Sequence, residues 1–316
     1  MAPILKQAFE SILTLFMMGL VGVYVVHRGW VTREVKDFLA RLVVGCTLPL
    51  YLFYTAVQEL TKKDIPGLMA GTTHAMLTMT LTFLLSLVFV KIAKVRQGRR
   101  GLFSVGFTFS NTMFLGLPIN VALFGESALP YVMSYFFSNS LMFWTLGNYM
   151  MSLDGPGKKS EILSLDTVKR FFNPPLIGFF IGLLVVILEV PIPKFLTGSA
   201  KLLGSTTTPL AIMYIGMGLG DLNLKTIHME KDIIYILLGR FLICPLLTVT
   251  ICLAFNLFPA MSRVFVIQSS LPVLANCSIM AGYYRSDTSF ALILVSLTTF
   301  LSLLTVPIFR MAVSLF

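Results

Sequence analysis

Two segments of the chain place helix-breaking residues and polar side chains inside otherwise apolar stretches. The first reads SNTMFLGLPIN from Ser110 to Asn120, and the second reads SSLPVLANCS from Ser269 to Ser278. Proline interrupts helical hydrogen bonding, and the backbone groups freed within a membrane must be buried in protein or line a cavity. The two segments therefore predict a binding site, with the candidate residues Asn111, Thr112, Gly116, Pro118, Ser270, Pro272 and Asn276.

The chemistry of such a site favours a small anion. A broken helix presents a half-helix N-terminus, where free N–H groups and the positive end of the helix dipole attract negative charge. The competing interpretation is a pair of proline kinks without a ligand. The Asn, Ser and Thr side chains around Pro118 and Pro272 exceed what a kink requires, so we favour the anion site.

Charged residues inside the apolar stretches are scarce, and one of them is basic. None of the 14 acidic residues lies deep in such a stretch, whereas cation carriers and proton relays usually place a carboxylate within the bilayer. Arg240 lies about eight residues, or roughly 12 Å, into its stretch. It is a candidate for binding the anion, or for bonding carbonyls of a broken helix. His74 is predicted to be an interior histidine with satisfied hydrogen bonds.

A further polar group lies on one helical face. Ser134 and Ser138 are four residues apart and Asn139 is adjacent, so the three side chains share a face. They would hydrogen-bond either substrate or a neighbouring helix. We assign Ser138 and Asn139 to the substrate site.

The composition predicts that these residues sit in an all-α integral membrane protein. Of 316 residues, 56% are hydrophobic and 12% are charged, against about 25% charged residues in a typical soluble domain. A spanning helix needs about 20 mostly apolar residues. Ten stretches qualify, at residues 8–27, 36–57, 67–93, 101–123, 128–152, 174–190, 195–219, 232–256, 262–284 and 288–311.

The net charge of +10 indicates the orientation of the chain in the membrane and does not indicate nucleic-acid binding. The basic residues form short clusters between apolar stretches, and 15 of the 24 follow odd-numbered spans while 7 lie on the opposite side. The positive-inside rule then places the central linker in the cytoplasm and both termini outside. The four cysteines lack metal-ligand or CxxC spacing, so no metal site or cofactor is predicted.

An internal repeat appears at an offset of 160 residues. Thr47-Leu48-Pro49-Leu50 aligns with Thr207-Thr208-Pro209-Leu210, and Gly22 aligns with Gly182. Chance similarity between Leu-rich helices is the alternative. Five spans per repeat is an odd number, so the second copy would enter the membrane from the opposite side, as in the inverted repeats of secondary transporters.

The chain resembles the auxin efflux carrier family, whose bacterial members are described as organic-acid permeases. The resemblance covers nearly the whole chain and rests on the ten-span layout, the central linker, the N-x-x-F-x-G-x-P run from Asn111 to Pro118, Pro272, and the second-span sequence from Leu48 to Phe53. Sodium/bile-acid symporters share the ten-span inverted design. Thr112 replaces a proline of the plant auxin exporters and the linker is short, so auxin is not the expected substrate.

The resemblance implies an elevator-type carrier. Residues 1–152 would form the first five-helix repeat, 153–172 the cytoplasmic linker and 173–316 the inverted second repeat. Helices 1, 2, 6 and 7 would form the scaffold and the homodimer contact. Helices 3–5 and 8–10 would form the transport domain, with the broken helices 4 and 9 crossing at the substrate.

The predicted function is secondary transport of small organic anions, such as malate, malonate or lactate, across the cell membrane. A proton or a sodium ion would be the coupling partner, and membrane lipid surrounds the protein. The alternatives are a sodium-coupled symporter of larger amphipathic anions and a membrane sensor that binds a ligand without moving it. An enzyme is not predicted, because no HExxH, GxSxG or paired intramembrane aspartates occur.

Overall fold

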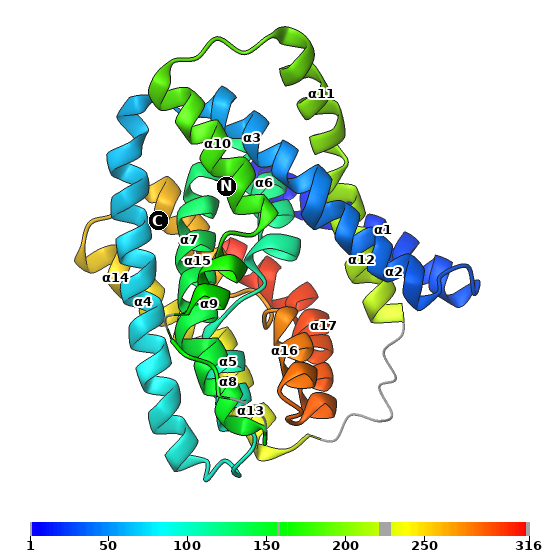
Figure 1. Cartoon of the computed structure of the whole chain (residues 1–316), viewed down its shortest axis with the longest axis vertical. Coiled ribbons are helices and arrows are strands. Elements are labelled where there is room, and N and C mark those ends of the chain that lie inside the picture. The colour runs from blue at the N-terminus through cyan, green and yellow to red at the C-terminus, as the bar shows by residue number, and fades with distance from the viewer. Residues whose placement is uncertain (1, 157–158, 163, 221–228, 314–316) are drawn as a thin grey trace. The chain divides into compact units, whose positions relative to one another are not determined.

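The computed structural model describes residues 2–156, 159–162, 164–220 and 229–313, and the regular secondary structure of this part of the chain is helical, with one isolated β-bridge and no β-strand (Figure 1). Each predicted apolar stretch is helical there, although the fourth and ninth are interrupted. Five helical segments are long and apolar enough to cross a membrane: Glu34–Glu59, Lys62–Ile92, Lys194–Gly220, Lys231–Ala254 and Thr288–Ala312. The chain is therefore an all-helical protein with several membrane-spanning helices, and the count of ten spans stays a prediction.

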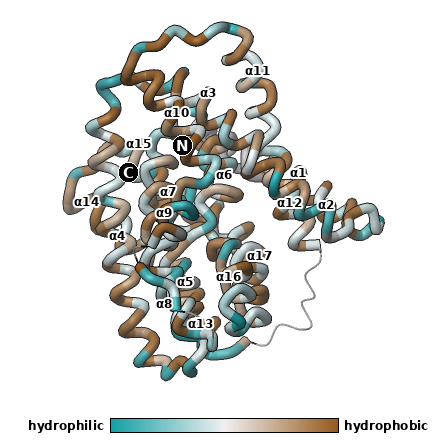
Figure 2. Tube along the Cα trace, viewed as in Figure 1, coloured by the Kyte–Doolittle hydropathy of each residue, from teal (hydrophilic) through white to brown (hydrophobic). Residues whose placement is uncertain are grey.

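Residue contacts divide the chain into two compact units. Unit 1 comprises Met1–Ala70, Met113–Met133 and Phe171–Leu222, and unit 2 comprises Gly71–Thr112, Ser134–Arg170 and Asn223–Phe316. Hydrophobic residues run along the helices of each unit, and hydrophilic residues gather at helix ends (Figure 2). Lys158 and Lys225, two basic residues of the predicted cytoplasmic linkers, lie outside the described residues.

Unit 1 is built from helices near the start and middle of the chain. They are α1 (Ala2–His27), α2 (Arg33–Leu42), α3 (Leu48–Glu59), α6 (Leu117–Phe124), α10 (Pro174–Leu188), α11 (Lys194–Ser205) and α12 (Thr207–Gly220), with short turns at Lys62–Asp64 and Glu126–Ala128. A π-helical turn, Val43–Thr47, joins α2 to α3 without a break. Asn173 caps α10 by accepting a hydrogen bond from the Leu176 N–H, ahead of prolines that fit the first helical turn.

Two helix pairs in unit 1 pack at positions that differ by 160 residues. In the α1–α12 pair, a Cβ atom at Gly22 would lie 2.1 Å from the Met213 carbonyl oxygen. In the α3–α10 pair, a Cβ atom at Gly182 would lie 2.9 Å from the Phe53 carbonyl oxygen. Glycine is required at both positions because the backbones approach too closely for any side chain, as is common between membrane helices.

Unit 2 contains the remaining helices and the two interruptions. Its helices are α5 (Arg100–Thr108), α8 (Asn148–Asp154), α9 (Leu165–Phe171, whose last residue falls in unit 1), α13 (Lys231–Leu238), α14 (Cys244–Ala254), α15 (Pro259–Ser269), α16 (Asn276–Tyr283) and α17 (Thr288–Ala312). Two longer helices, α4 (Ile65–Ile92) and α7 (Leu129–Met142), begin in unit 1 and continue into unit 2. π-Helical turns occur at Phe143–Gly147 and Gly239–Ile243, and a third, Thr112–Gly116, begins in unit 2 at Thr112 and continues in unit 1. The predicted linker 153–172 therefore contains a short helix, α9, that the sequence pattern did not indicate.

Candidate functional site

The two interrupted segments of unit 2 pair with each other as extended chain. Helix α5 ends at Thr108 and α15 ends at Ser269, and Ser110 and Val273 then form an antiparallel β-bridge. The Asn111 N–H donates to the Pro272 carbonyl oxygen at 2.8 Å, and the Leu274 N–H donates to the Phe109 oxygen at 3.2 Å. Backbone groups that helix formation would have satisfied are therefore satisfied between the two halves of the sequence.

Side chains from two other helices hold this bridge. Asn139, on α7, binds Ser110 through both ends of its amide: its Oδ1 accepts from the Ser110 N–H at 3.2 Å, and its Nδ2 donates to the Ser110 oxygen at 3.1 Å. The Val273 N–H donates to Thr298 Oγ1 on α17 at 3.1 Å. These bonds remove the cost of buried unpaired backbone groups, and they engage both polar atoms of Asn139.

Several buried polar atoms next to the bridge have no hydrogen-bond partner among the described residues. They include Asn111 Oδ1, Thr112 Oγ1, and both amide atoms of Gln268, whose side chain is fully buried in α15. Buried polar groups are normally paired. These unpaired acceptors and donors lie near the ends of two interrupted helices. A binding site for a polar ligand would leave such atoms unpaired until the ligand binds.

Arg240 is fully buried and has only part of its hydrogen-bonding capacity satisfied. It lies in the π-helical turn that precedes α14, and its Nη2 donates to the Ser269 carbonyl oxygen at 2.6 Å. Its Nε and Nη1 atoms have no partner, and it forms no ion pair within the described part of the chain. Gly239 lets this turn lie directly against the Phe107 ring.

The burial of Arg240 without a counter-ion has an energetic consequence. The desolvation penalty of an unpaired ion in a protein interior is on the order of several kcal/mol. One carbonyl of the interrupted helix offsets part of this penalty. An anionic ligand beside Arg240 would offset the remainder.

The structure brings together some of the predicted site residues and separates others. Asn111, Thr112, Asn139, Arg240, Ser270 and Pro272 lie in or against the paired segments of unit 2, and Asn276 begins α16 just after them. Gly116 and Pro118 lie in unit 1, where Asn120 Nδ2 donates to the Gly116 oxygen at 2.7 Å.

Three of the side chains that we assigned to the substrate site already form hydrogen bonds with the backbone. Ser138 Oγ donates to the Thr72 oxygen at 2.8 Å and the Ser134 oxygen at 3.0 Å. Ser270 Oγ donates to the Ile267 oxygen at 2.8 Å. With Asn139, these residues position the interrupted segments.

Sequence reasoning missed Gln268 and Thr298. Gln268 had a usable signal, because a glutamine immediately before a helix break in an apolar stretch is costly to bury. Thr298 had no such signal, because threonines are ordinary in membrane helices and only its contact with the Val273 N–H distinguishes it.

His74 packs edge-on against the Phe255 ring, with ring centroids 4.8 Å apart.

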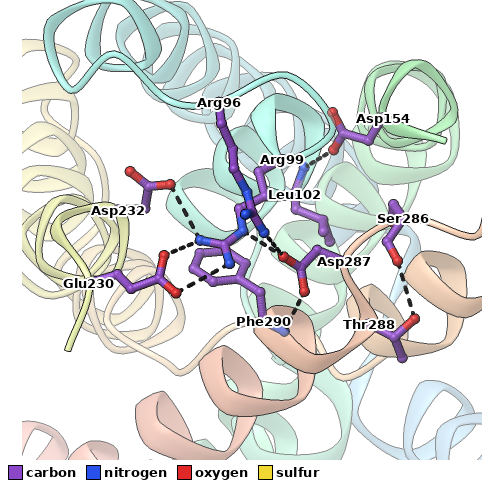
Figure 3. Close-up of polar contacts among 10 residues, drawn as sticks. All are labelled: Arg96, Arg99, Leu102, Asp154, Glu230, Asp232, Ser286, Asp287, Thr288 and Phe290. Atoms are coloured by element: carbon purple, nitrogen blue, oxygen red, sulfur yellow. Dashed lines mark hydrogen bonds and ion pairs between the residues drawn. The ribbon is translucent and has the colours of Figure 1, made fainter. Parts of the chain in front are cut away.

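A second polar centre of unit 2 surrounds Arg99 at the start of α5 (Figure 3). The Arg99 side chain is buried and forms ion pairs with Glu230, with Asp232 at 3.7 Å and with Asp287, whose Oδ2 accepts from Nε at 2.7 Å. Its guanidinium also lies 4.2 Å from the centre of the Phe290 ring. The cluster ties the first turns of α5, α13 and α17 together.

The charges of this cluster alter the pKa values of its members. Hydrogen bonding to Arg99 lowers the pKa of Glu230. Burial alone would raise the pKa of Asp287, but the Phe290 N–H and the Arg99 and Arg96 guanidinium groups outweigh it and lower that pKa. Glu230 and Asp287 therefore stay charged at neutral pH, and both are paired with Arg99. The cluster therefore joins helices and offers no open position for a ligand.

Asp154 makes a related connection at the end of α8. Its carboxylate accepts a hydrogen bond from the Leu102 N–H at 2.8 Å (Figure 3) and another from the Gly101 N–H at 3.0 Å. These are the free N–H groups in the first turn of α5, which favour a negative charge. Burial nevertheless raises the pKa of Asp154.

Comparison with known proteins identifies the class of protein that carries this site. A family model described as "Membrane transport protein" matches residues 7–310. An "Uncharacterized transporter" of Methanothermobacter thermautotrophicus is 24% identical over 305 residues, which cover 95% of this chain and 96% of the relative. A "Putative malonate transporter" of Rhizobium meliloti is 25% identical over 281 residues, which cover 86% of this chain and 85% of the relative.

These findings confirm the resemblance to the auxin efflux carriers. The family and these relatives are transporters and not enzymes. With several helices long enough to cross a membrane, the chain belongs to the membrane transport protein family.

Proposed function

We propose that this chain is a secondary transporter of small organic anions, mono- or dicarboxylates such as malate, malonate or lactate, in the cell membrane. The observation that carries the proposal is the fully buried Arg240, which has no counter-ion among the described residues and two nitrogen atoms without a partner. A carboxylate matches the planar donor fork of a guanidinium. The name of the Rhizobium relative refers to malonate, which is a ligand of this class.

The paired interrupted segments would supply the neutral part of the site. Asn111, Thr112 and Gln268 present unpaired buried polar atoms, while Asn139 and Thr298 hold the backbone in place. Such a site is preorganised, so little rearrangement would accompany binding. In this proposal Asn111 and Arg240 contact the anion, and Asn139, Ser138 and Ser270 position the segments.

We further propose an elevator-type movement of a transport domain built from helices 3–5 and 8–10 against a scaffold of helices 1, 2, 6 and 7, which would also form a homodimer. The division of contacts into two units supports this proposal, since unit 1 holds α1–α3 and α10–α12 and unit 2 holds α13–α17. The equivalent packing of Gly22 and Gly182 supports two inverted repeats. One feature does not agree with the proposed domains. Helix α6 belongs to the fourth predicted span, which would be part of the transport domain, but it lies in unit 1.

Thermal unfolding of the purified protein with a panel of mono- and dicarboxylates tests the anion site, with sodium and pH varied independently. A ligand that binds the folded state raises the Tm by mass action. We expect at least one acid to raise the Tm of the natural protein. We expect Arg240→Gln to remain folded and to lose this increase. Lys201→Gln, which removes an exposed charge on α11, is the matched control and should keep it.

The outcomes separate the alternatives. Retention of the increase in Arg240→Gln would remove Arg240 from the site and leave it as a structural partner of Ser269. A Tm increase with sodium alone or with larger amphipathic anions would favour the sodium-coupled symporter. Binding without flux of the same acid in proteoliposomes would favour the sensor.

A further inference from the structure

We propose that a cavity in unit 2, between α8, α16 and the central linker, binds the headgroup of an anionic phospholipid. The cavity has a volume of about 160 Å³ and a largely polar lining. This volume is comparable with that of cavities that hold a benzene-sized molecule. The residues that line it are Asn148, Lys159, Ser160, Glu161, Ser164, Thr167, Arg170, Tyr283 and Tyr284.

Arg170 is one of two cationic groups that line the cavity, and among the described residues neither of them forms an ion pair. Its guanidinium lies 5.0 Å from the centre of the Tyr283 ring and 5.6 Å from that of Trp144. Its Nη1 is 3.3 Å from the sulfur of Met280, which is a weak acceptor. Within the described part of the chain it forms no ion pair. The two rings and the sulfur hold the guanidinium in place while its remaining N–H groups stay available.

The other walls of the cavity are fixed by hydrogen bonds. The Tyr284 hydroxyl donates to Asn148 Oδ1 at 2.9 Å, and Asn148 Nδ2 donates to Ser160 Oγ at 2.9 Å. Lys159 Nζ lies 3.4–3.5 Å from three carbonyl oxygens at the end of α8. Glu161 is the one carboxylate in the lining, so two cations face one anion. This balance favours a ligand with a single negative charge.

Apolar side chains of α9, the helix that carries Thr167 and Arg170, are open to the exterior, as is Tyr283 in the lining of the cavity. Leu165 and Val168, three residues apart on α9, are 79% and 48% exposed, and Tyr283 is 65% exposed. With seven residues, α9 is far shorter than the roughly 20 residues needed to span a membrane. An apolar stripe beside basic residues on such a helix is typical of a segment that lies in the membrane interface.

A phospholipid satisfies both features at once. Its phosphodiester carries one negative charge that a guanidinium can bind through paired hydrogen bonds, and its acyl chains would cover Leu165 and Val168. The linker is also predicted to be cytoplasmic, where anionic lipids attract basic residues. A free phosphate would use Arg170 but would leave the apolar stripe uncovered.

Lipid-induced thermal stabilisation of the detergent-purified full-length protein tests the proposal. We expect phosphatidylglycerol in mixed micelles to raise the Tm and phosphatidylcholine to have no such effect. We expect Arg170→Gln to weaken the apparent affinity for phosphatidylglycerol by about tenfold, because it removes a hydrogen bond between charged groups. Lys169→Gln removes the same charge from an adjacent exposed residue outside the cavity and should retain the effect. Leu165→Ser should also weaken lipid binding.

Each remaining outcome overturns the assignment. Equal losses in Arg170→Gln and Lys169→Gln would indicate diffuse attraction between the linker and the membrane. An equal Tm increase with glycerol 3-phosphate or inorganic phosphate would identify a soluble anion as the ligand. If Arg170→Gln does not fold, Arg170→Lys provides the comparison, because it keeps the charge and loses the paired geometry. Unchanged binding in Arg170→Lys and Leu165→Ser together would exclude the cavity.

Discussion

The hydroxyl group of Thr207 donates a hydrogen bond to the hydroxyl oxygen of Thr47 at 3.0 Å, and the two residues are 160 positions apart. Both side chains are buried in unit 1, beside the start of α12 and α3 respectively. Residues that align in the proposed repeat therefore meet each other directly, as expected for two residues beside a pseudo-twofold axis.

A double-mutant cycle on this pair should show strong coupling. Thr47→Val or Thr207→Val alone leaves one buried hydroxyl unpaired and should cost about 1–3 kcal/mol of stability. The double variant removes both hydroxyls and should be closer to the natural protein than either single variant. Additive losses, measured by thermal unfolding, would mean that the two hydroxyls do not depend on each other.

Glycine positions in unit 1 offer a test with an internal control. Gly22→Ala places a methyl group 2.1 Å from the Met213 oxygen, so it should destabilise the protein by about 1–3 kcal/mol through overpacking. Gly198, inside α11, has no atom within 4 Å of an added Cβ. Gly198→Ala should therefore be neutral or stabilising by up to about 1 kcal/mol. Similar Tm values for the two variants would contradict the close α1–α12 packing.

Substitution of Asn139 should lower the stability of the protein, whereas substitution of Asn111 should weaken ligand binding. Asn139→Ala leaves the buried Ser110 N–H unpaired, while the Ser110 carbonyl oxygen keeps its bond from the Thr112 N–H. The ligand-free protein should therefore lose about 1–3 kcal/mol of stability. Asn111 Oδ1 has no hydrogen-bond partner among the described residues, so in Asn111→Ala the ligand-free Tm should hardly change while the acid-induced Tm increase is lost. The proposed division of roles fails if Asn139→Ala has the natural Tm, or if Asn111→Ala keeps its response to acids.

Arg99 should control the stability of unit 2. Arg99→Met removes the partner of Glu230 and Asp287 and leaves Asp232 without its nearest cation. The expected cost is on the order of 3 kcal/mol, because Glu230 and Asp232 then lose their ion-pair partner and Asp287 keeps only the more exposed Arg96. Arg41→Met, on the exposed surface of α2, is the control and should stay within about 0.5 kcal/mol.

The same cluster predicts how stability depends on pH. The pKa values of Glu230 and Asp287 are lowered in the folded protein, from ordinary values of about 4.3 and 3.9. Their contribution is therefore complete above about pH 4.3 and is lost as the pH falls through the lower folded values. Thermal unfolding between neutral pH and pH 3 should show this loss in the natural protein and a smaller loss in Arg99→Met. Equal losses in the two proteins would assign the acid sensitivity elsewhere.

The predicted orientation can be measured by cysteine labelling. In a background without the four native cysteines, Lys194→Cys should react with a membrane-impermeant maleimide in intact cells, and Lys159→Cys should react only after permeabilisation. The physical reason is the excess of basic residues on the linker side of the membrane. The reverse pattern would place the linker outside.

The sequence by itself determined the class of protein and the location of the helix breaks. Scarcity of charge and repeated apolar stretches require burial in lipid, and a proline such as Pro272 interrupts a helix wherever the helix lies. These are local properties, so they can be read without knowing which helices are neighbours. The sequence also shows that Gly22 and Gly182 match at an offset of 160 residues, because this match is a property of the sequence alone.

Only the tertiary structure decided what each polar group does. Asn139 and Asn111 are both asparagines in apolar stretches, yet one is fully used by the Ser110 backbone and the other has an unpaired oxygen. Arg99 and Arg240 are both buried arginines, yet one has three carboxylates and the other has a single carbonyl. Burial makes every such group depend on a partner, and those partners come from segments far away in the sequence. A local pattern therefore identifies the groups that need a partner, and the fold supplies it or leaves the position open for a ligand.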